Sequence, residues 1–331
     1  MTLPQDMLTI TITTPGGPEV LATARSPLPV PGDDQVLVRV AAAGVNGPDL
    51  LQRRGLYPPP PGASPLMGLE VSGEVVATGR TAQRWQVGDK ICALTNGGGY
   101  AEYVTIDAGQ CLPIPQGISL IDAAGLPETF FTVWSNIFHG HDVPEGAVLL
   151  VHGGAGGIGA TAIQMGKAMG LRVFATAGGA AACSFATALG AERAIDYRDE
   201  DFVAVLREEA GGADIILDII GGDYIARNIK ASKPDARLIS LAFNKGSKVE
   251  LDLMPMMLKR LTLTGATLRS RPPAFKAAVA AGLEQHIWPK IAAGEITATT
   301  YRTFPLAEAL AAHQLLEEAG KQGKILLTCA G

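Results

Sequence analysis

The pattern of apolar and polar positions changes at about residue 148. The run 148–151 is short, continuous and apolar, as expected of a strand buried on both faces. Beyond it, apolar runs alternate with segments of helical period up to residue 266. This alternation predicts a parallel sheet with helices on both faces. We expect strands at 148–151, 172–177, 193–195, 213–218, 237–241 and 261–266, and helices at 157–169, 181–189, 201–210 and 224–231.

The segments on either side have another pattern. Residues 1–118 are rich in Val, Gly and Pro, and short runs such as 36–40, 71–78 and 101–106 predict strands joined by turns. Residues 119–140 have a helical pattern. After residue 270 we expect a helix and a few strands, with 323–327 returning to the first domain as an edge strand. The fold class is therefore α/β, with a β-rich domain and a doubly wound parallel sheet.

A glycine motif opens the predicted parallel-sheet domain. Gly154, Gly156 and Gly159 fit G-x-G-x-x-G, and the motif follows a predicted strand and begins a predicted helix. Gly154 would allow the tight turn, Gly156 would admit a pyrophosphate, and Gly159 would let the helix pack against the strand. The predicted phosphate-binding residues are Gly154, Ala155, Gly156, Gly157, Ile158 and Gly159.

The end of the second strand bears on the choice of cofactor. NAD-binding domains usually place an acidic residue there, ~20 residues after the motif, for the ribose hydroxyls. This chain has Gly178 and Gly179 and no acid, while Tyr197 and Arg198 follow the third strand. We therefore predict NADPH, with Gly178, Gly179 and Tyr197 among the residues that bind it.

Other candidates follow the later strands, because ligands bind such sheets at the carboxyl ends of the strands. Ile220 follows the fourth strand and Phe243 the fifth, and Leu268 and Ser270 follow the sixth. We expect these four residues to contact the cofactor.

Composition excludes several classes of function. The 331 residues are 47% hydrophobic and 18% charged, with a net charge of −5 and no basic stripe, so nucleic-acid binding is not expected. No apolar run reaches the ~18 residues of a membrane span, and the first residues do not resemble a secretory signal. The four cysteines and five histidines show no metal-ligand spacing, which indicates a cytoplasmic protein with no bound metal.

Several motifs together resemble one family, the zeta-crystallin-like quinone oxidoreductases of the medium-chain dehydrogenase/reductase superfamily. They also resemble the branch typified by the tumour-suppressor-inducible quinone oxidoreductase. The matching segments are 43–49, 54–60, 68–73, 87–89, 98–104, 126–132, 218–222 and 268–271. The resemblance implies a GroES-like catalytic domain at 1–118, completed by 271–331, a Rossmann NADP-binding domain at 119–270, and a homodimer or homotetramer.

The resemblance also implies roles for single residues. Asn46 would line the nicotinamide and substrate pocket, Tyr57 would bond or protonate a substrate oxygen, and Thr132 would contact the cofactor. Zinc is not expected, because zinc-dependent relatives have Cys near Asn46 and His at Leu69. The chain departs from the family at Ala182, where members that bind NADPH often carry Lys.

The sequence thus predicts an NADPH-dependent quinone oxidoreductase that transfers a hydride or electrons without zinc. One alternative is an NADPH-dependent reductase of conjugated enones, alkenals or enoyl thioesters, since hydride addition uses the same geometry. An alternative of another class is a crystallin-like or RNA-binding protein that binds NADPH without physiological turnover. The acidic net charge argues against RNA.

Overall fold

The computed structural model describes residues 3–329 and divides into two compact units. One unit comprises Met1–Phe131 and Arg269–Gly331, and the other Thr132–Leu268. Residues 1–2 and 330–331 of the predicted catalytic domain lie outside the described residues. The packing therefore divides the chain at 131/132 and 268/269, whereas the motifs place the domain boundaries at 118/119 and 270/271.

The first unit is built on a seven-stranded sheet in the order β14-β15-β3-β4-β5-β7, with β6 paired to β3. A separate hairpin pairs β1 with β2. The strands are β1 (Asp6–Ile12), β2 (Leu21–Pro27), β3 (Gln35–Val45), β4 (Glu70–Thr78), β5 (Lys90–Leu94), β6 (Tyr103–Asp107), β7 (Cys111–Pro113), β14 (Thr300–Pro305) and β15 (Lys324–Thr328). Its helices are α1 (Gly47–Arg53), α8 (Pro273–His286), α9 (Trp288–Ala292) and α10 (Ala309–Glu317), with short 3-10 turns at η1 (Pro18–Val20), η2 (Ala108–Gln110), η3 (Asp122–Gly125) and η4 (Leu306–Glu308).

The predicted return of the chain at 323–327 is confirmed, but its predicted edge position is wrong. β15 pairs with β3 on one side and with β14 on the other, so it lies inside the sheet. The reason is that β14, a strand that the sequence did not mark clearly, occupies the edge. Four of the five residues of β15 are buried, as an interior strand requires.

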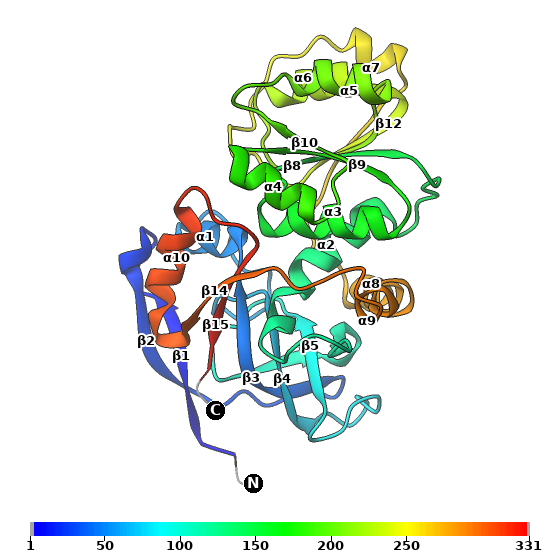
Figure 1. The fold of residues 1–331 in the computed structure, drawn as a ribbon. Coiled ribbons are helices and arrows are strands. Elements are labelled where there is room, and N and C mark those ends of the chain that lie inside the picture. Colours follow the sequence, from blue (N-terminus) through cyan, green and yellow to red (C-terminus); the bar gives the residue numbers. More distant parts are fainter. Residues whose placement is uncertain (1–2, 330–331) are drawn as a thin grey trace. The chain divides into compact units, whose positions relative to one another are not determined.

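The second unit has a six-stranded parallel sheet in the order β10-β9-β8-β11-β12-β13. Numbered within this unit, the order is 3-2-1-4-5-6, which is the order of dinucleotide-binding sheets. Figure 1 shows α3 and α4 on one face and α5, α6 and α7 on the other. The strands are β8 (Val148–His152), β9 (Arg172–Ala177), β10 (Arg193–Asp196), β11 (Ala213–Asp218), β12 (Ser232–Ser240) and β13 (Thr262–Gly265). The helices are α3 (Gly157–Ala168), α4 (Ala180–Ala188), α5 (Phe202–Ala210), α6 (Tyr224–Ala231) and α7 (Met254–Leu258), and α2 (Pro127–Ile137) begins in the first unit and ends in this one.

Local sequence explains these elements. All five residues of β8 are buried, as the continuous apolar run predicted. Helix α5 begins after Asp201, whose carboxylate accepts a hydrogen bond from the Val203 amide, and ends at Gly211 with φ 68°. Strand β12 begins five residues before the predicted start at 237, and its pairing with β11 is irregular over that stretch. Across residues 3–329, no helix is long and apolar enough to span a membrane.

Candidate functional site

The glycine motif forms the turn between β8 and α3, as predicted. A Cβ on Gly159 would lie 2.2 Å from the Gly153 carbonyl oxygen, so only glycine permits this packing of helix on turn. The left-handed residue of the turn is Gly153, with φ 75°, rather than Gly154, to which the tight turn was assigned. Gly154 is restricted instead by Ala175, whose Cβ would lie 2.9 Å from an added Cβ. Helix α3 therefore starts close to the end of the strand, with its free N–H groups at the sheet edge.

Gly178 and Gly179, in the turn that follows β9, lie against the end of β10. The hydroxyl of Tyr197 would lie 2.4 Å from a Cβ on Gly178, and a guanidinium nitrogen of Arg198 would lie 3.0 Å from one on Gly179. The Asp196 carboxylate accepts hydrogen bonds from the amides of Gly179 and Arg198, each at 3.1 Å. A phenol and a cation are thus held beside the turn that follows β9, where the sequence placed them.

A buried polar chain that the sequence did not reveal lies under this edge. Asn228 donates to the Asp218 carboxylate at 3.1 Å, so its carbonyl oxygen faces His152 Nε2 at 2.8 Å and accepts a hydrogen bond from it. His152 Nδ1 is then an acceptor for the Thr176 hydroxyl, at 3.0 Å. Burial lowers the pKa of His152, which keeps the ring neutral. These hydrogen bonds link β9, β8, β11 and α6. The sequence did not predict them, because His152 stands among apolar residues with no polar pattern.

The loops after β11 and β12 meet at the same edge. The Asp218 carboxylate accepts hydrogen bonds from the amides of Ile220 and Gly221, at 2.6 and 3.1 Å. A Cβ on Gly221 would lie 2.7 Å from the Phe243 ring, which is 48% exposed. The structure thus brings the loop that contains Ile220 and Gly221 close to Phe243.

The remaining cofactor candidates lie apart from these loops in the chain. Thr132 is in α2, where its carbonyl oxygen accepts hydrogen bonds from Ser135 and Asn136. Leu268 ends the parallel-sheet unit, whereas Ser270 belongs to the β-rich unit.

In the β-rich unit, Asn46 is the N-cap of α1 and only 7% exposed. Its main-chain amide donates to the Asp49 carboxylate at 2.9 Å, which closes a capping box. Its side-chain amide donates to the Glu70 carboxylate at 2.9 Å, and its side-chain carbonyl accepts from the Lys324 ammonium at 2.6 Å. Asn46 is therefore a fixed side chain and not an exposed turn residue.

Glu70 and Lys324 form a buried ion pair beside Asn46, with 2.5 Å between Nζ and Oε1. The second Glu70 oxygen accepts from the Glu128 main-chain amide at 2.8 Å. Gly44 in β3 makes this arrangement possible, because a Cβ there would lie 1.9 Å from Glu70 Oε1. The sequence did not reveal Lys324, which is 278 residues from Asn46 in the chain.

Three carboxyl groups, those of Asp49, Glu70 and Glu128, thus lie near one ammonium, that of Lys324. Burial raises the pKa of Glu128 to about 8, with a further contribution from the charge of Glu70. Burial also raises the pKa of Asp49, to about 6, against the two main-chain amides that donate to it. Glu128 is therefore a neutral acid at pH 7.

Tyr57 is half-buried, and its ring lies under the guanidinium of Arg269, 5.5 Å from the ring centroid. Arg269 is fixed by hydrogen bonds to the Asn96 carbonyl, at 2.9 Å, and to the Gln52 side chain, at 2.8 Å. Burial raises the pKa of the Tyr57 phenol, and the charge of Glu128 raises it further. Tyr57, which precedes the four prolines at 58–61, thus presents a protonated hydroxyl in the same unit as Asn46.

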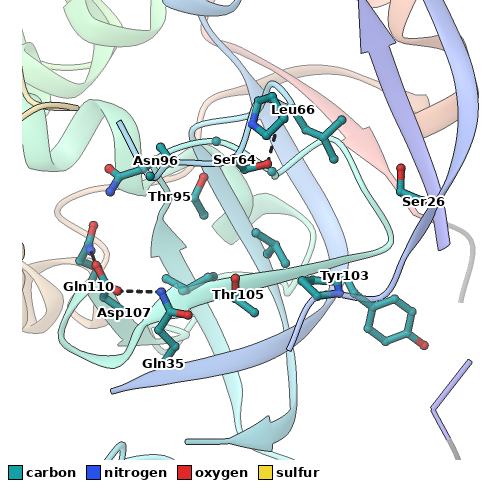
Figure 2. A pocket seen from close by; sticks show the side chains of 18 of the residues that line it. Ser26, Gln35, Ser64, Leu66, Thr95, Asn96, Tyr103, Thr105, Asp107 and Gln110 are labelled. Carbon is teal, nitrogen blue, oxygen red and sulfur yellow. Dashed lines mark hydrogen bonds between the residues drawn. The ribbon is translucent and has the colours of Figure 1, made fainter. Parts of the chain in front are cut away.

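A cavity of about 380 Å³ lies elsewhere in this unit. Figure 2 shows Gln35 and Gln110 directed at the Asp107 carboxylate, at 3.1 and 2.5 Å. The cavity is lined by neither Asn46 nor Tyr57. It is therefore separate from the predicted substrate site.

Comparison with known families agrees with this geometry. Residues 32–116 match the alcohol dehydrogenase GroES-like domain, and residues 157–284 match the family model described as zinc-binding dehydrogenase. The quinone oxidoreductase of Rattus norvegicus is 29% identical over 321 residues, which cover 94% of each chain. The chain belongs to the medium-chain dehydrogenase/reductase superfamily, in its quinone oxidoreductase group. This confirms the resemblance to the quinone oxidoreductases of that superfamily, while the resemblance to one branch stays a prediction.

Solved structures of the superfamily show the same fold. The Escherichia coli quinone oxidoreductase, complexed with NADPH, matches with a TM-score of 0.83 and 28% identity over 97% of this chain and 99% of that one. A structure named NAD-dependent alcohol dehydrogenase matches with a TM-score of 0.84 and 29% identity, over 98% of this chain and 100% of that one. The predicted fold class is confirmed.

One of the matching family models is named for zinc, but the residues at the expected zinc positions of this chain are not zinc ligands. Asn46 and Leu69 supply no thiolate or imidazole, and the Lys324 ammonium is placed between Asn46 and Glu70. Within residues 3–329, no group of three or more His, Cys, Asp or Glu side chains is arranged to hold a metal ion. Independence of zinc stays a prediction.

The raised pKa of Glu128 predicts a pH-dependent stability. Because the folded-state pKa lies above the unfolded value of 4.5, the folded protein keeps a proton that the unfolded chain releases. Stability from this group is complete below about pH 4.5 and falls as the pH rises to about 8. Glu128→Gln cannot ionise, so its Tm should increasingly exceed that of the wild type between pH 5 and 8 and then keep that difference to pH 9. Thermal unfolding at pH 5, 7 and 9 measures this.

Glu250→Gln, at an exposed position, is the matched control and should follow the wild type at each pH. A constant difference in Tm between Glu128→Gln and wild type across the range would show that the Glu128 carboxyl titrates normally.

Proposed function

We propose that this protein is an NADPH-dependent quinone oxidoreductase. The observation that carries the proposal is the arrangement at the carboxyl ends of the parallel strands. A glycine turn, a helix N-terminus and the Tyr197–Arg198 pair lie there, at the ends of neighbouring strands. The relatives named quinone oxidoreductase and the NADPH complex of the E. coli enzyme support both parts of it.

The residues present fit a dinucleotide with a 2′-phosphate. A Cβ at Gly153, Gly154 or Gly159 would clash with its neighbours, at 2.6, 2.9 and 2.2 Å. The compact turn would therefore let its backbone approach the pyrophosphate closely, and the start of α3 favours negative charge. Arg198 beside Gly179 would pair with the 2′-phosphate, in place of the Lys that Ala182 replaces. Ile220 and Phe243 would line the edge nearer the nicotinamide, with Thr132, Leu268 and Ser270 as further contacts.

When bound, NADPH supplies the hydride or electrons, and the protein supplies position and polarity. Asn46 and Tyr57 would each place a polar hydrogen beside a substrate oxygen. Quinones are already electrophilic, so such a site needs neither a metal nor a strong general acid.

Two rival functions make different predictions. Reduction of a conjugated enone would use the same hydride geometry but needs a proton at carbon, which gives Tyr57 a larger role. A binding role without turnover would leave NADPH bound tightly while no acceptor oxidises it.

The first experiment compares NADPH and NADH binding by fluorescence titration, followed by oxidation of the better one with 1,2- and 1,4-quinones and an enone. We expect tighter NADPH binding and quinone-dependent oxidation. Arg198→Ala should weaken NADPH binding by roughly 10-fold, about 1.4 kcal/mol, and leave NADH binding unchanged. Arg207→Ala, at an exposed arginine bonded to a main-chain carbonyl, is the control. Tighter binding of NADH than NADPH would overturn the cofactor assignment.

The variant Tyr57→Phe separates the two enzymatic functions. A quinone oxidoreductase should lose only a few-fold in kcat with quinones, because the phenol is not essential to hydride acceptance. An enone reductase should lose roughly 10²-fold or more in kcat with enones, the usual effect of removing a general acid. Wild-type turnover confined to the enone, together with this loss, would move the assignment to double-bond reduction.

We further propose a homodimer formed along β13. This edge strand is exposed at all four residues, and its free N–H and C=O groups offer a template for a second copy. Apolar side chains beside it are exposed, with Leu253 at 60%, Met257 at 63% and Leu258 at 66%. Two copies that pair edge to edge would extend the sheet and cover these side chains.

Light scattering after size-exclusion chromatography should give twice the chain mass of 34.4 kDa. Leu258→Glu should shift the mass to that of a monomer, whereas Val87→Glu, at an exposed residue of the other unit, should not. A wild-type monomer would refute the dimer, and four chain masses would show the tetramer instead. A cytoplasmic location remains part of the proposal.

A further inference from the structure

The side-chain amide of Asn46 has only one orientation that its neighbours permit. The Lys324 ammonium has three donors and no acceptor, so the Asn46 atom 2.6 Å from it must be the carbonyl oxygen. The opposite end of the amide faces a Glu70 oxygen at 2.9 Å, and an ionised carboxylate only accepts. Because one buried partner only donates hydrogen bonds and the other only accepts them, the flipped orientation of the Asn46 amide is excluded.

The partners are themselves fixed. Glu70 is fully buried and Lys324 is 5% exposed, and both Glu70 oxygens receive hydrogen bonds or the ammonium. A flip of Asn46 would set its N–H groups against the ammonium and its carbonyl oxygen against the carboxylate. At low local dielectric both contacts are strongly unfavourable.

One Asn46 N–H remains after the other is used by Glu70. We propose that Lys324 is a positioning residue that holds this N–H as a hydrogen-bond donor to the substrate's carbonyl oxygen. The inference rests on the proposed quinone reduction and deepens it, because it defines the substrate as one with an acceptor oxygen at this point. Asn46 is then the residue that touches substrate, and Lys324 acts through it.

The Asn46 N–H has its largest effect when negative charge develops on the substrate oxygen. The quinone accepts a hydrogen with both electrons from the dihydronicotinamide, and one quinone oxygen becomes an anion until it takes a proton from water. A donor already aimed at that oxygen stabilises the anion more than the neutral carbonyl, so it lowers the barrier. Removing one such donor typically costs about 10²–10³ in kcat.

Asn46→Asp is the first test, since it keeps the side-chain shape and the helix cap but has no N–H to offer the substrate. We expect kcat with a quinone to fall roughly 100-fold, with the Kd for NADPH unchanged. Binding of 4-nitrophenolate, followed by its absorbance, gives a second readout without turnover. This anion mimics the charged oxygen, and its affinity should fall at least 10-fold.

The role of Lys324 is tested in the double variant Lys324→Met/Glu70→Gln, because removing one partner alone would leave a buried charge unpaired and destabilise the fold. The double variant has no such charge and should keep a near-native Tm. Without the ammonium the amide is free to turn, so kcat and phenolate affinity should each fall about 10-fold or more. Arg39→Gln, which breaks the half-buried ion pair that Arg39 of β3 makes with Glu74 of β4, should change neither.

A double variant with native Tm, wild-type kcat and wild-type phenolate affinity would overturn the inference. So would a wild-type kcat for Asn46→Asp, which decides the matter if the double variant fails to fold. A different pattern would refute the proposed function alone: a wild type that reduces no quinone, yet binds phenolate in a manner that depends on Lys324 and Asn46.

Discussion

The ion pair between Lys324 and Glu70 fixes the local structure of the β-rich unit. It links β15 to β4 across β3, at the point where Gly44 leaves space for the carboxylate. A buried ion pair stabilises a fold only when its remaining polar atoms are satisfied, and here both Glu70 oxygens are. The pair thereby sets the conformation of Asn46 and the start of α2 at Glu128.

The parallel unit uses a hydrogen-bond network around a neutral histidine for the same purpose. His152, Asn228 and Asp218 form a line of hydrogen bonds under the sheet edge, and Asp218 receives the amides of the loop at Ile220. Because each donor in this line meets an acceptor, the loops at the edge are held without any charge on the histidine. Rigid loops at the carboxyl ends of parallel strands are what a dinucleotide site requires.

Much of the fold was predictable because local signals agree with one another. The apolar run at β8, the glycine turn and the alternation of strands and helices all point to the same parallel sheet. The glycines of the motif could be predicted from local sequence, since the turn needs residues without a Cβ. The edge assignment of β15 failed because pairing with β14 depends on contacts that no local pattern encodes.

The sequence by itself determined the parallel sheet, the position of the glycine turn and the family, because periodicity and short motifs act within a few tens of residues. Only the tertiary structure decided which charges meet. Lys324 and Asn46 are 278 residues apart, and no spacing rule relates them. Their contact arises where β15 pairs with β3, and burial there gives the contact its effect, because a charge shielded from water orients its neighbours far more strongly than an exposed one.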